Sequence, residues 1–162
     1  GEFYTKAAAK ADAEGFLGVA SLMRAAAKVE SVHGASYIKA LTDLKAQLGP
    51  GPEQAALEVK GTRENLTEAA KLASAKREAD LPAARKAAEA EGQRDAARAF
   101  RDAREGQIEL VRQFKDAAEL SDTWKKKRDY YVGRTCGYLV EKLDLTKCPV
   151  CGKGRDDFEK VN

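Results

Sequence analysis

The stretch VASLMRAAAKVESVHG, residues 19–34, combines an apolar stripe with a polar pair on one helical face. Its apolar residues recur at steps of three and four, which is the pattern of one buried helix face. These are Val19, Leu22, Met23 and Ala26, followed further along by Tyr37, Leu41 and Leu44. Glu30 and His33 lie on that face about one turn apart, and bundle proteins present a carboxylate and an imidazole to one metal in this way. A polar pair on a core face is costly unless a partner satisfies it, so the pair is either a working ligand set or a remnant.

Three more helices are predicted around this one. The four are expected at residues 4–14, 15–48, 63–91 and 93–119. The sequence GPGP at 49–52 ends the second helix, and Thr62 is expected as the N-cap of the third. Pro82 lies inside the third helix and predicts a kink or a break, because proline lacks the amide hydrogen and clashes with the preceding turn. Gly92 separates the last two helices, and four helices in this order predict a bundle.

The composition supports a mainly α fold. Charged residues make up 34% of the chain and aromatic residues 7%, there are only four prolines, and alanine is abundant. These values favour helices and argue against a β-sandwich or a barrel. The expected organisation is a four-helix bundle over residues 4–120, a linker at 121–129 and a small module at 130–162.

The charges indicate solvated helix faces. The net charge is only +3, from 29 basic and 26 acidic residues interleaved along the helices, so no nucleic-acid partner is expected. The run WKKKRDYY at 124–131 could hold a phosphate backbone and stack bases, but no basic face supports it elsewhere, and a charged linker is the simpler interpretation. No apolar run approaches the ~18–20 residues of a membrane span, and the first residues lack the layout of a signal peptide. We expect a soluble, intracellular protein in a reducing compartment, without membrane contact.

All three cysteines lie in the C-terminal module. CPVCG at 148–152 is a Cys-x-x-Cys knuckle, whose small loop directs Cys148 and Cys151 at one ion. The segment around Cys136 would form a second knuckle if it had one more cysteine, but the residue three positions before Cys136 is Gly133. Three interpretations stay open: an iron or zinc site whose fourth ligand is water, a carboxylate or a neighbouring chain; an unmetallated knuckle; or a disulfide, which suits an odd cysteine count in a reducing compartment poorly. The unmetallated knuckle would be folded by a small core of Tyr131, Tyr138, Leu139 and Phe158.

The chain also repeats itself at a fixed offset. ADAEG at 11–15 returns as AEAEG 77 residues later, which indicates two related helical hairpins. At the same offset, Glu30 and His33 correspond to Gln107 and Leu110, so the second hairpin lacks both the carboxylate and the imidazole. A two-metal bundle site needs ligands from all four helices, and half of this one is absent.

Several segments carry a family resemblance. They are YTKAAAKADAEGF…VASLMRAAAKVESVHG, then TRENL, AEAEG and AARAF, and finally DYYVGRTCGYLVE…KCPVCGKGRDDFEKV. Together they resemble rubrerythrin over nearly the whole chain. That family joins a ferritin-like four-helix bundle, which holds a di-iron site, to a rubredoxin-like module in which four cysteines hold one iron. The resemblance implies that electrons pass through the module iron to the di-iron centre, which reduces hydrogen peroxide. It also implies a homodimer, or pairing with a related chain, in which the module of one chain approaches the bundle of the other.

Several ligand positions of that family are substituted in this chain. The helix-two Glu-x-x-His falls on Glu30 and His33 and is intact. The substituted positions are Ala73 and Lys76 in the third helix, Gln107 and Leu110 in the fourth, and Gly133 in place of the first rubredoxin cysteine. The helix-one glutamate falls upstream of residue 1, while Cys136, Cys148 and Cys151 remain. The resemblance therefore implies that a di-iron centre is not expected and that the cysteine module holds at most one iron or zinc.

Three functions stay open on these grounds. A rubrerythrin-type peroxide reductase would be an oxidoreductase, but one glutamate and one histidine do not supply the anionic ligands that two metal ions need. A single-metal electron-transfer protein would work through the cysteines. A non-catalytic derivative would keep the bundle as a structural or partner-binding protein, and we favour this function. Glu30 and His33 are then a remnant pair, and we expect Lys76 to point inward and supply the positive charge beside Glu30, with Gln107 completing the arrangement.

Overall fold

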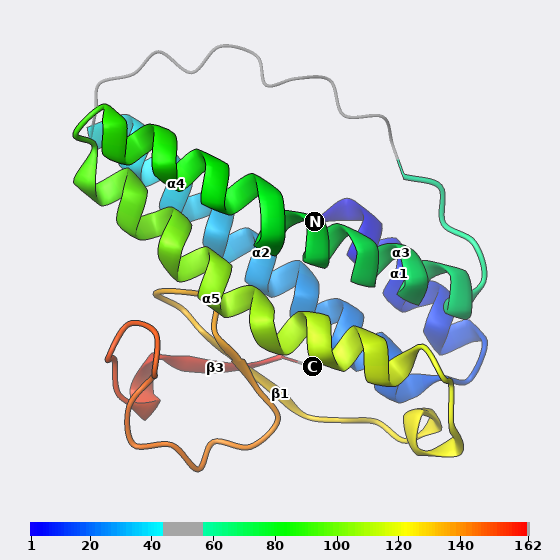
Figure 1. The fold of residues 1–162 in the computed structure, drawn as a ribbon. Coiled ribbons are helices and arrows are strands. Elements are labelled where there is room, and N and C mark those ends of the chain that lie inside the picture. The colour runs from blue at the N-terminus through cyan, green and yellow to red at the C-terminus, as the bar shows by residue number, and fades with distance from the viewer. Residues whose placement is uncertain (44–56, 162) are drawn as a thin grey trace.

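Four helical stretches form a bundle, and a small sheet lies against one side of it (Figure 1). The computed structural model describes residues 1–43 and 57–161. The first two stretches are α1 (Glu2–Ala13) and α2 (Leu17–Asp43), and the last is α5 (Arg94–Ala117). The third stretch consists of two successive helices, α3 (Thr62–Ala75) and α4 (Leu81–Ala90). The predicted fold class, a mainly α four-helix bundle with a small C-terminal cysteine module, is confirmed. The predicted end of the second helix and the GPGP break fall within 44–56, outside the described residues.

The predicted third helix is continuous but changes its winding in the middle. A π-helical turn at Lys76–Asp80 joins α3 to α4. Pro82 follows this turn in the first turn of α4. Proline has no amide hydrogen, and its ring clashes with the carbonyl four residues earlier, so a widened turn at that place relieves both conflicts. Where the sequence predicted a kink or a break at Pro82, the structure therefore has a π turn just before this residue.

The two hairpins of the bundle end their first helices in the same way. After α1, the Gly15 amide donates to Asp12 O (3.0 Å) and the Phe16 amide to Ala11 O (2.9 Å). After α4, the Gly92 amide donates to Glu89 O (3.1 Å) and the Gln93 amide to Ala88 O (2.8 Å). This pair of bonds requires a left-handed residue, and the two glycines have φ values of 79° and 70°. The matching caps lie 77 residues apart and support the repeat of two helical hairpins.

The bundle core is completed by α1 along only part of α2. In the first half of α2, Val19, Leu22, Met23 and Ala26 are fully buried. In its second half, Tyr37 and Leu41 are only half-buried, and Ile38 is 56% exposed. The predicted buried stripe is thus correct near the start of α2 and only partly buried beyond Glu30.

The C-terminal module is built on a three-stranded antiparallel sheet. Its strands are β1 (Tyr130–Gly133), β2 (Leu139–Val140) and β3 (Phe158–Val161), in the order β2-β1-β3. Tyr130, Val132 and Leu139 are fully buried. The predicted module core is correct for Leu139 but wrong for Tyr131, Tyr138 and Phe158, which are half-buried. Alternate residues of β1 face opposite sides, and it is Tyr130 and Val132 that face inward.

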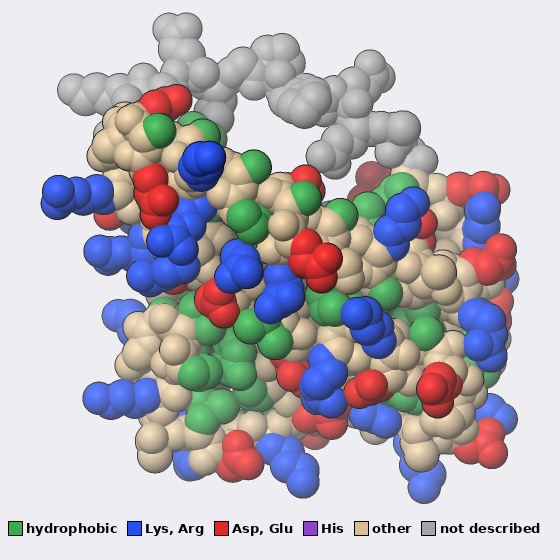
Figure 2. Space-filling view, in the orientation of Figure 1, with side chains coloured by type: hydrophobic (Ala, Val, Ile, Leu, Met, Phe, Trp, Pro, Cys, Tyr) green, Lys and Arg blue, Asp and Glu red, His purple; other side chains and the backbone are tan. Residues whose placement is uncertain are grey.

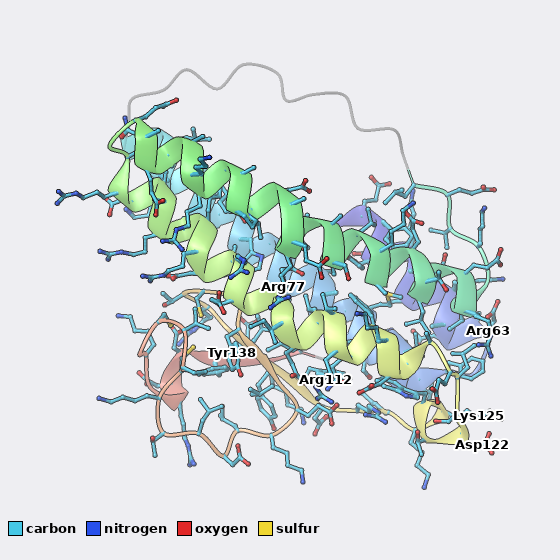
Figure 3. All side chains as sticks on the ribbon, in the orientation of Figure 1. Arg63, Arg77, Arg112, Asp122, Lys125 and Tyr138 are labelled. Carbon is cyan, nitrogen blue, oxygen red and sulfur yellow. The ribbon has the colours of Figure 1, made fainter. Side chains whose placement is uncertain are left out.

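Polar contacts fasten the module and the linker to the bundle. The Tyr130 hydroxyl donates to Gln113 Oε1 of α5 at 3.2 Å, and Lys28 of α2 pairs with Glu159 of β3 at 2.8 Å. The linker contains a short 3-10 turn at Asp122–Lys125. Its Trp124 is buried, and the Arg128 guanidinium stacks 3.7 Å from the centre of the Trp124 ring. Figure 3 shows the module beside α5, with Tyr138 and Arg112 along this boundary.

Charged side chains of both signs cover the face shown in Figure 2. Basic residues nevertheless gather where α4 and α5 meet, because arginines three and four positions apart share one side of α5. Arg85, Arg94, Arg98 and Arg101 line a hollow there together with Glu89. Two of these arginines are paired with carboxylates, Arg85 with Glu89 at 2.8 Å and Arg101 with Asp102 at 2.6 Å. No helix in the described part of the chain is long and apolar enough to cross a membrane.

Candidate metal sites

The carboxylate of Glu30 lies at the centre of a polar cluster between α2, the π turn and α5. Its Oε2 atom contacts the Lys76 ammonium group, and its Oε1 atom accepts a hydrogen bond from Gln107 Nε2 at 3.0 Å. Glu30 and Gln107 are 77 residues apart, so the two equivalent positions of the hairpin repeat meet face to face. The expected pairing of Lys76 with Glu30, completed by Gln107, is confirmed.

The ion pair is less buried than the sequence suggested. The Glu30 side chain is 13% exposed, whereas that of Lys76 is 41% exposed. A hollow reaches the pair from the surface, and it is lined by residues from the start of α1, from α3 and from the π turn, among them Glu2, Tyr4, Leu72 and Asp80. Lys76 therefore reaches the carboxylate with its ammonium group while part of its side chain stays in contact with solvent.

Two opposing effects set the pKa of Glu30. Burial by itself raises the pKa of this carboxyl group, because it disfavours the charged form. The Lys76 ammonium and the hydrogen bonds from Lys76 and Gln107 outweigh burial, so the pKa is lowered from its ordinary value. Glu30 is thus ionised at neutral pH without a metal ion.

His33 is directed at the cysteine module and not at Glu30. It is 3% exposed, and burial lowers the pKa of its imidazole, which leaves the ring neutral. The neutral ring then donates from Nε2 to the carbonyl oxygen of Cys136 at 3.1 Å. Two glycines allow this contact. A Cβ atom would lie 3.2 Å from His33 Nε2 if added at Gly106 and only 2.6 Å from it if added at Gly137, where φ is +72°.

The other bundle positions that the resemblance assigns to di-iron ligands carry no suitable donor groups. Ala73 and Leu110 are each 1% exposed and present only aliphatic atoms to the core. Gln107 Oε1 is buried and has no hydrogen-bond partner among the described residues. With a single carboxylate, and that one in contact with an ammonium group, these residues do not fit a pair of iron ions.

The three cysteines, in contrast, converge on one point. The sulfur atoms of Cys136, Cys148 and Cys151 all lie within 4.8 Å of one another, and those of Cys136 and Cys148 are 3.6 Å apart. All three are free thiols. Burial raises the pKa of the Cys136 and Cys151 thiols, so a metal ion that binds their thiolates must displace protons. This donor set fits a soft or borderline ion such as zinc or iron.

Two successive turns hold these cysteines with the same hydrogen bonds. In the turn 133–138, the Gly137 amide donates to Gly133 O (2.8 Å) and the Gly133 amide to Tyr138 O (2.9 Å). In the turn 148–153, the Gly152 amide donates to Cys148 O (2.9 Å) and the Cys148 amide to Lys153 O (2.7 Å). Cys136 thus corresponds to Cys151, and Gly133 corresponds to Cys148. Gly133 is therefore the position in the first turn that is equivalent to a cysteine in the second.

The family model described as Rubrerythrin matches residues 1–106. The chain belongs to the rubrerythrin family. A search of curated proteins by sequence found no match. Among solved structures, fully reduced, all-ferrous nigerythrin has a TM-score of 0.86 at 23% identity, over 98% of this chain and 78% of that one. Mixed-valence nigerythrin has a TM-score of 0.82 at 25% identity, over 99% and 78%. The rubrerythrin-like chain thus shares with nigerythrin the arrangement of a helical bundle beside a C-terminal module.

Proposed function

We propose that this rubrerythrin-family chain is a non-catalytic derivative, whose bundle is retained as a structural or partner-binding unit and whose metal binding is confined to the cysteine module. The observation that carries the proposal is the contact between Lys76 and Glu30. An ammonium group fixed on the bundle carboxylate opposes the entry of two divalent cations, both by repulsion and by occupying the oxygen that would bind them.

The surrounding positions support the same conclusion. Catalysis at two metal ions needs several anionic ligands, which balance the ionic charge and fix the coordination geometry. Ala73 and Leu110 offer no donor atoms, and the amide of Gln107 is neutral. The bundle therefore keeps its packing without an iron pair, and peroxide reduction at this centre is not expected.

The cysteine module supports a second role, in binding one iron or zinc. Cys136, Cys148 and Cys151 would hold the ion, and their sulfur atoms are already gathered within 4.8 Å. An iron there would supply one-electron exchange, whereas zinc would act only as a cross-link. The module itself positions the thiols through its paired turns, and its contact with His33 ties the site to the bundle. Free thiols of this kind favour a reducing, intracellular location.

We also propose that the chain pairs with a second copy or with a related chain. In the second half of α2, Tyr37 and Leu41 are only half-buried, and Ile38 is 56% exposed. Apolar side chains that are exposed together on one helix are typical of a face that binds a partner.

Iron counting and peroxide turnover test the proposal together. The protein is reconstituted anaerobically with ferrous iron, and bound iron is counted for the wild type and for a Cys136→Ser/Cys148→Ser variant, which leaves the bundle unchanged. We expect at most one iron per chain in the wild type and none in the variant, with peroxide consumption no faster than that of free iron. A variant that restores acidic and histidine ligands, Ala73→Glu/Lys76→Glu/Gln107→Glu/Leu110→His, is the positive control. Two irons and peroxide turnover in the cysteine variant would refute a non-catalytic bundle.

A further inference from the structure

We propose that a metal ion held by the three cysteines keeps one exchangeable coordination position beside Gly133, and that this position selects small neutral ligands with an N–H or O–H group over anions. The inference rests on the proposed metal site of the cysteine module and concerns the ligand that completes it. Water would fill the position at rest, and a neutral nitrogen base such as imidazole would replace it.

The first step is the direction of the open position. The turn 133–138 repeats the hydrogen bonds of the turn 148–153, so a side chain at Gly133 would point at the sulfur cluster as that of Cys148 does. The nearest atoms to a Cβ at Gly133 are Asp157 Oδ2 at 3.6 Å, Cys136 Sγ at 3.7 Å and the Tyr138 amide nitrogen at 3.7 Å. These are ordinary contact distances, so the place of the fourth thiolate is free of steric conflict and borders on Cys136.

The second step is that the described residues supply no substitute ligand. The group of donor atoms that lie within reach of one ion contains the three sulfur atoms alone among the described residues. His33, the only histidine of the chain, donates from Nε2 to the Cys136 carbonyl. Asp157 is held beside the cluster by Thr135, whose amide donates to Oδ2 (3.1 Å) and whose hydroxyl donates to Oδ1 (2.8 Å). Zinc and iron in thiolate sites favour four ligands, so in this proposal a ligand from solution completes the set.

The third step is the charge around the open position. A divalent ion with three thiolates carries a net charge of −1, and the Asp157 carboxylate adds a second negative charge at the edge of the open position. The nearby Arg134 guanidinium is held by the backbone oxygens of Asp156 and Asp157. An anionic fourth ligand meets repulsion from both negative charges. A neutral ligand avoids this repulsion, and its N–H or O–H group can donate to Asp157 Oδ2, as metal-bound imidazoles commonly donate to a nearby carboxylate.

Cobalt(II) is a suitable probe because its visible d–d bands and its near-ultraviolet thiolate bands report the ligand set. The full-length protein is loaded with Co²⁺ under argon without added thiol, and is then titrated separately with imidazole and with azide. We expect imidazole to shift the d–d bands with saturation, and azide to produce no shift at equal concentration. The Gly133→Cys variant, with four thiolates, should show stronger thiolate bands and no response to either ligand.

Asp157→Asn tests the selectivity, with Asp156→Asn as the matched control at an exposed neighbour. The Asp157 variant should bind imidazole about tenfold more weakly, because it loses a hydrogen bond to a charged acceptor, and should begin to respond to azide. The control should behave as the wild type. A wild-type Co²⁺ spectrum that ignores imidazole, or that matches the spectrum of Gly133→Cys, would overturn the inference while leaving the metal site in place. Failure of the wild type to bind Co²⁺ at all would instead remove the proposed metal site and the inference with it.

Discussion

Replacing Lys76 by methionine should destabilise the bundle, because it leaves the Glu30 carboxylate buried without its cation. Pairs at the surface contribute about 0–1 kcal/mol, and breaking a fully buried pair costs about 3–5 kcal/mol. Glu30 is 13% exposed and keeps its hydrogen bond from Gln107, which places Lys76→Met between these limits at about 2 kcal/mol. For a chain of this size that corresponds to a decrease in melting temperature of about 4–8 °C.

The opposite replacement should be milder. In Glu30→Gln, the Lys76 side chain, already 41% exposed, can turn fully into water, so we expect a loss of about 1 kcal/mol. The double variant Glu30→Gln/Lys76→Met should lose about 1 kcal/mol, less than Lys76→Met alone, since no uncompensated charge remains. The double-mutant cycle then gives a coupling energy of about 2 kcal/mol.

Urea unfolding of the metal-free, reduced protein measures these values, and pH adds a second readout. In the wild type, the lowered pKa of Glu30 means that its contribution to stability is present above its unfolded-state pKa and is lost as pH falls through the folded-state value. In Lys76→Met, the effect of burial is opposed only by Gln107 and the smaller contribution of His33, and the pKa of Glu30 should rise. The stability difference between wild type and variant should therefore grow as pH rises through about 4.5, the ordinary pKa of a glutamate. Additive single effects, within about 0.3–0.5 kcal/mol, or a difference that shrinks with rising pH, would refute the reasoning.

Three further predictions concern His33, the metal site and the contact between module and bundle. Because burial lowers the pKa of His33, the unfolded chain binds the proton more readily, so stability should fall as pH drops below about 6.5, the ordinary value. His33→Gln should flatten this part of the stability profile measured by urea unfolding. Zinc affinity, measured by competition with a chelating dye, should weaken as pH falls because Cys136 and Cys151 must lose protons to bind. Gly133→Cys should raise affinity at every pH, and equal affinities would contradict an open fourth position. Gly137→Ala should destabilise the protein by about 1–3 kcal/mol, because its Cβ would lie 2.6 Å from His33 Nε2 at a φ of +72°. Gly152→Ala is the matched control, with φ +74° and no atom within 4 Å of the added Cβ, so an equal loss in both variants would assign the effect to backbone strain alone.

Local features of the fold could be read from the sequence because their causes are local. The apolar steps of α2, the glycines that end α1 and α4, and the proline behind the π turn each act within a few residues. The Cys-x-x-Cys spacing likewise fixes the turn 148–153. The 77-residue repeat identified Gln107 as the counterpart of Glu30, and their side chains meet, whereas Ala73 and Lys76 were identified as substituted ligand positions only by the family resemblance.

Other features depend on segments that are distant in the chain. The depth of the Lys76–Glu30 pair could not be predicted, because the two residues are 46 positions apart in the sequence and their burial depends on how α2 and the π turn pack together. The sequence also could not predict which alternate residues of β1 face the bundle, because Tyr130 and Tyr131 are both apolar enough to do so. Only packing against α5, where the Tyr130 hydroxyl meets Gln113, distinguishes them.

The sequence by itself determined which groups are available: one bundle carboxylate, one imidazole, one lysine in a ligand position and three thiols. The tertiary structure decided what each group contacts. It brought Lys76 to Glu30, turned His33 to a carbonyl 103 residues away, and set Gly133 opposite Asp157 at the edge of the sulfur cluster. Side-chain chemistry is a property of each residue, whereas charge pairing, burial and open coordination positions arise only when distant residues are packed together.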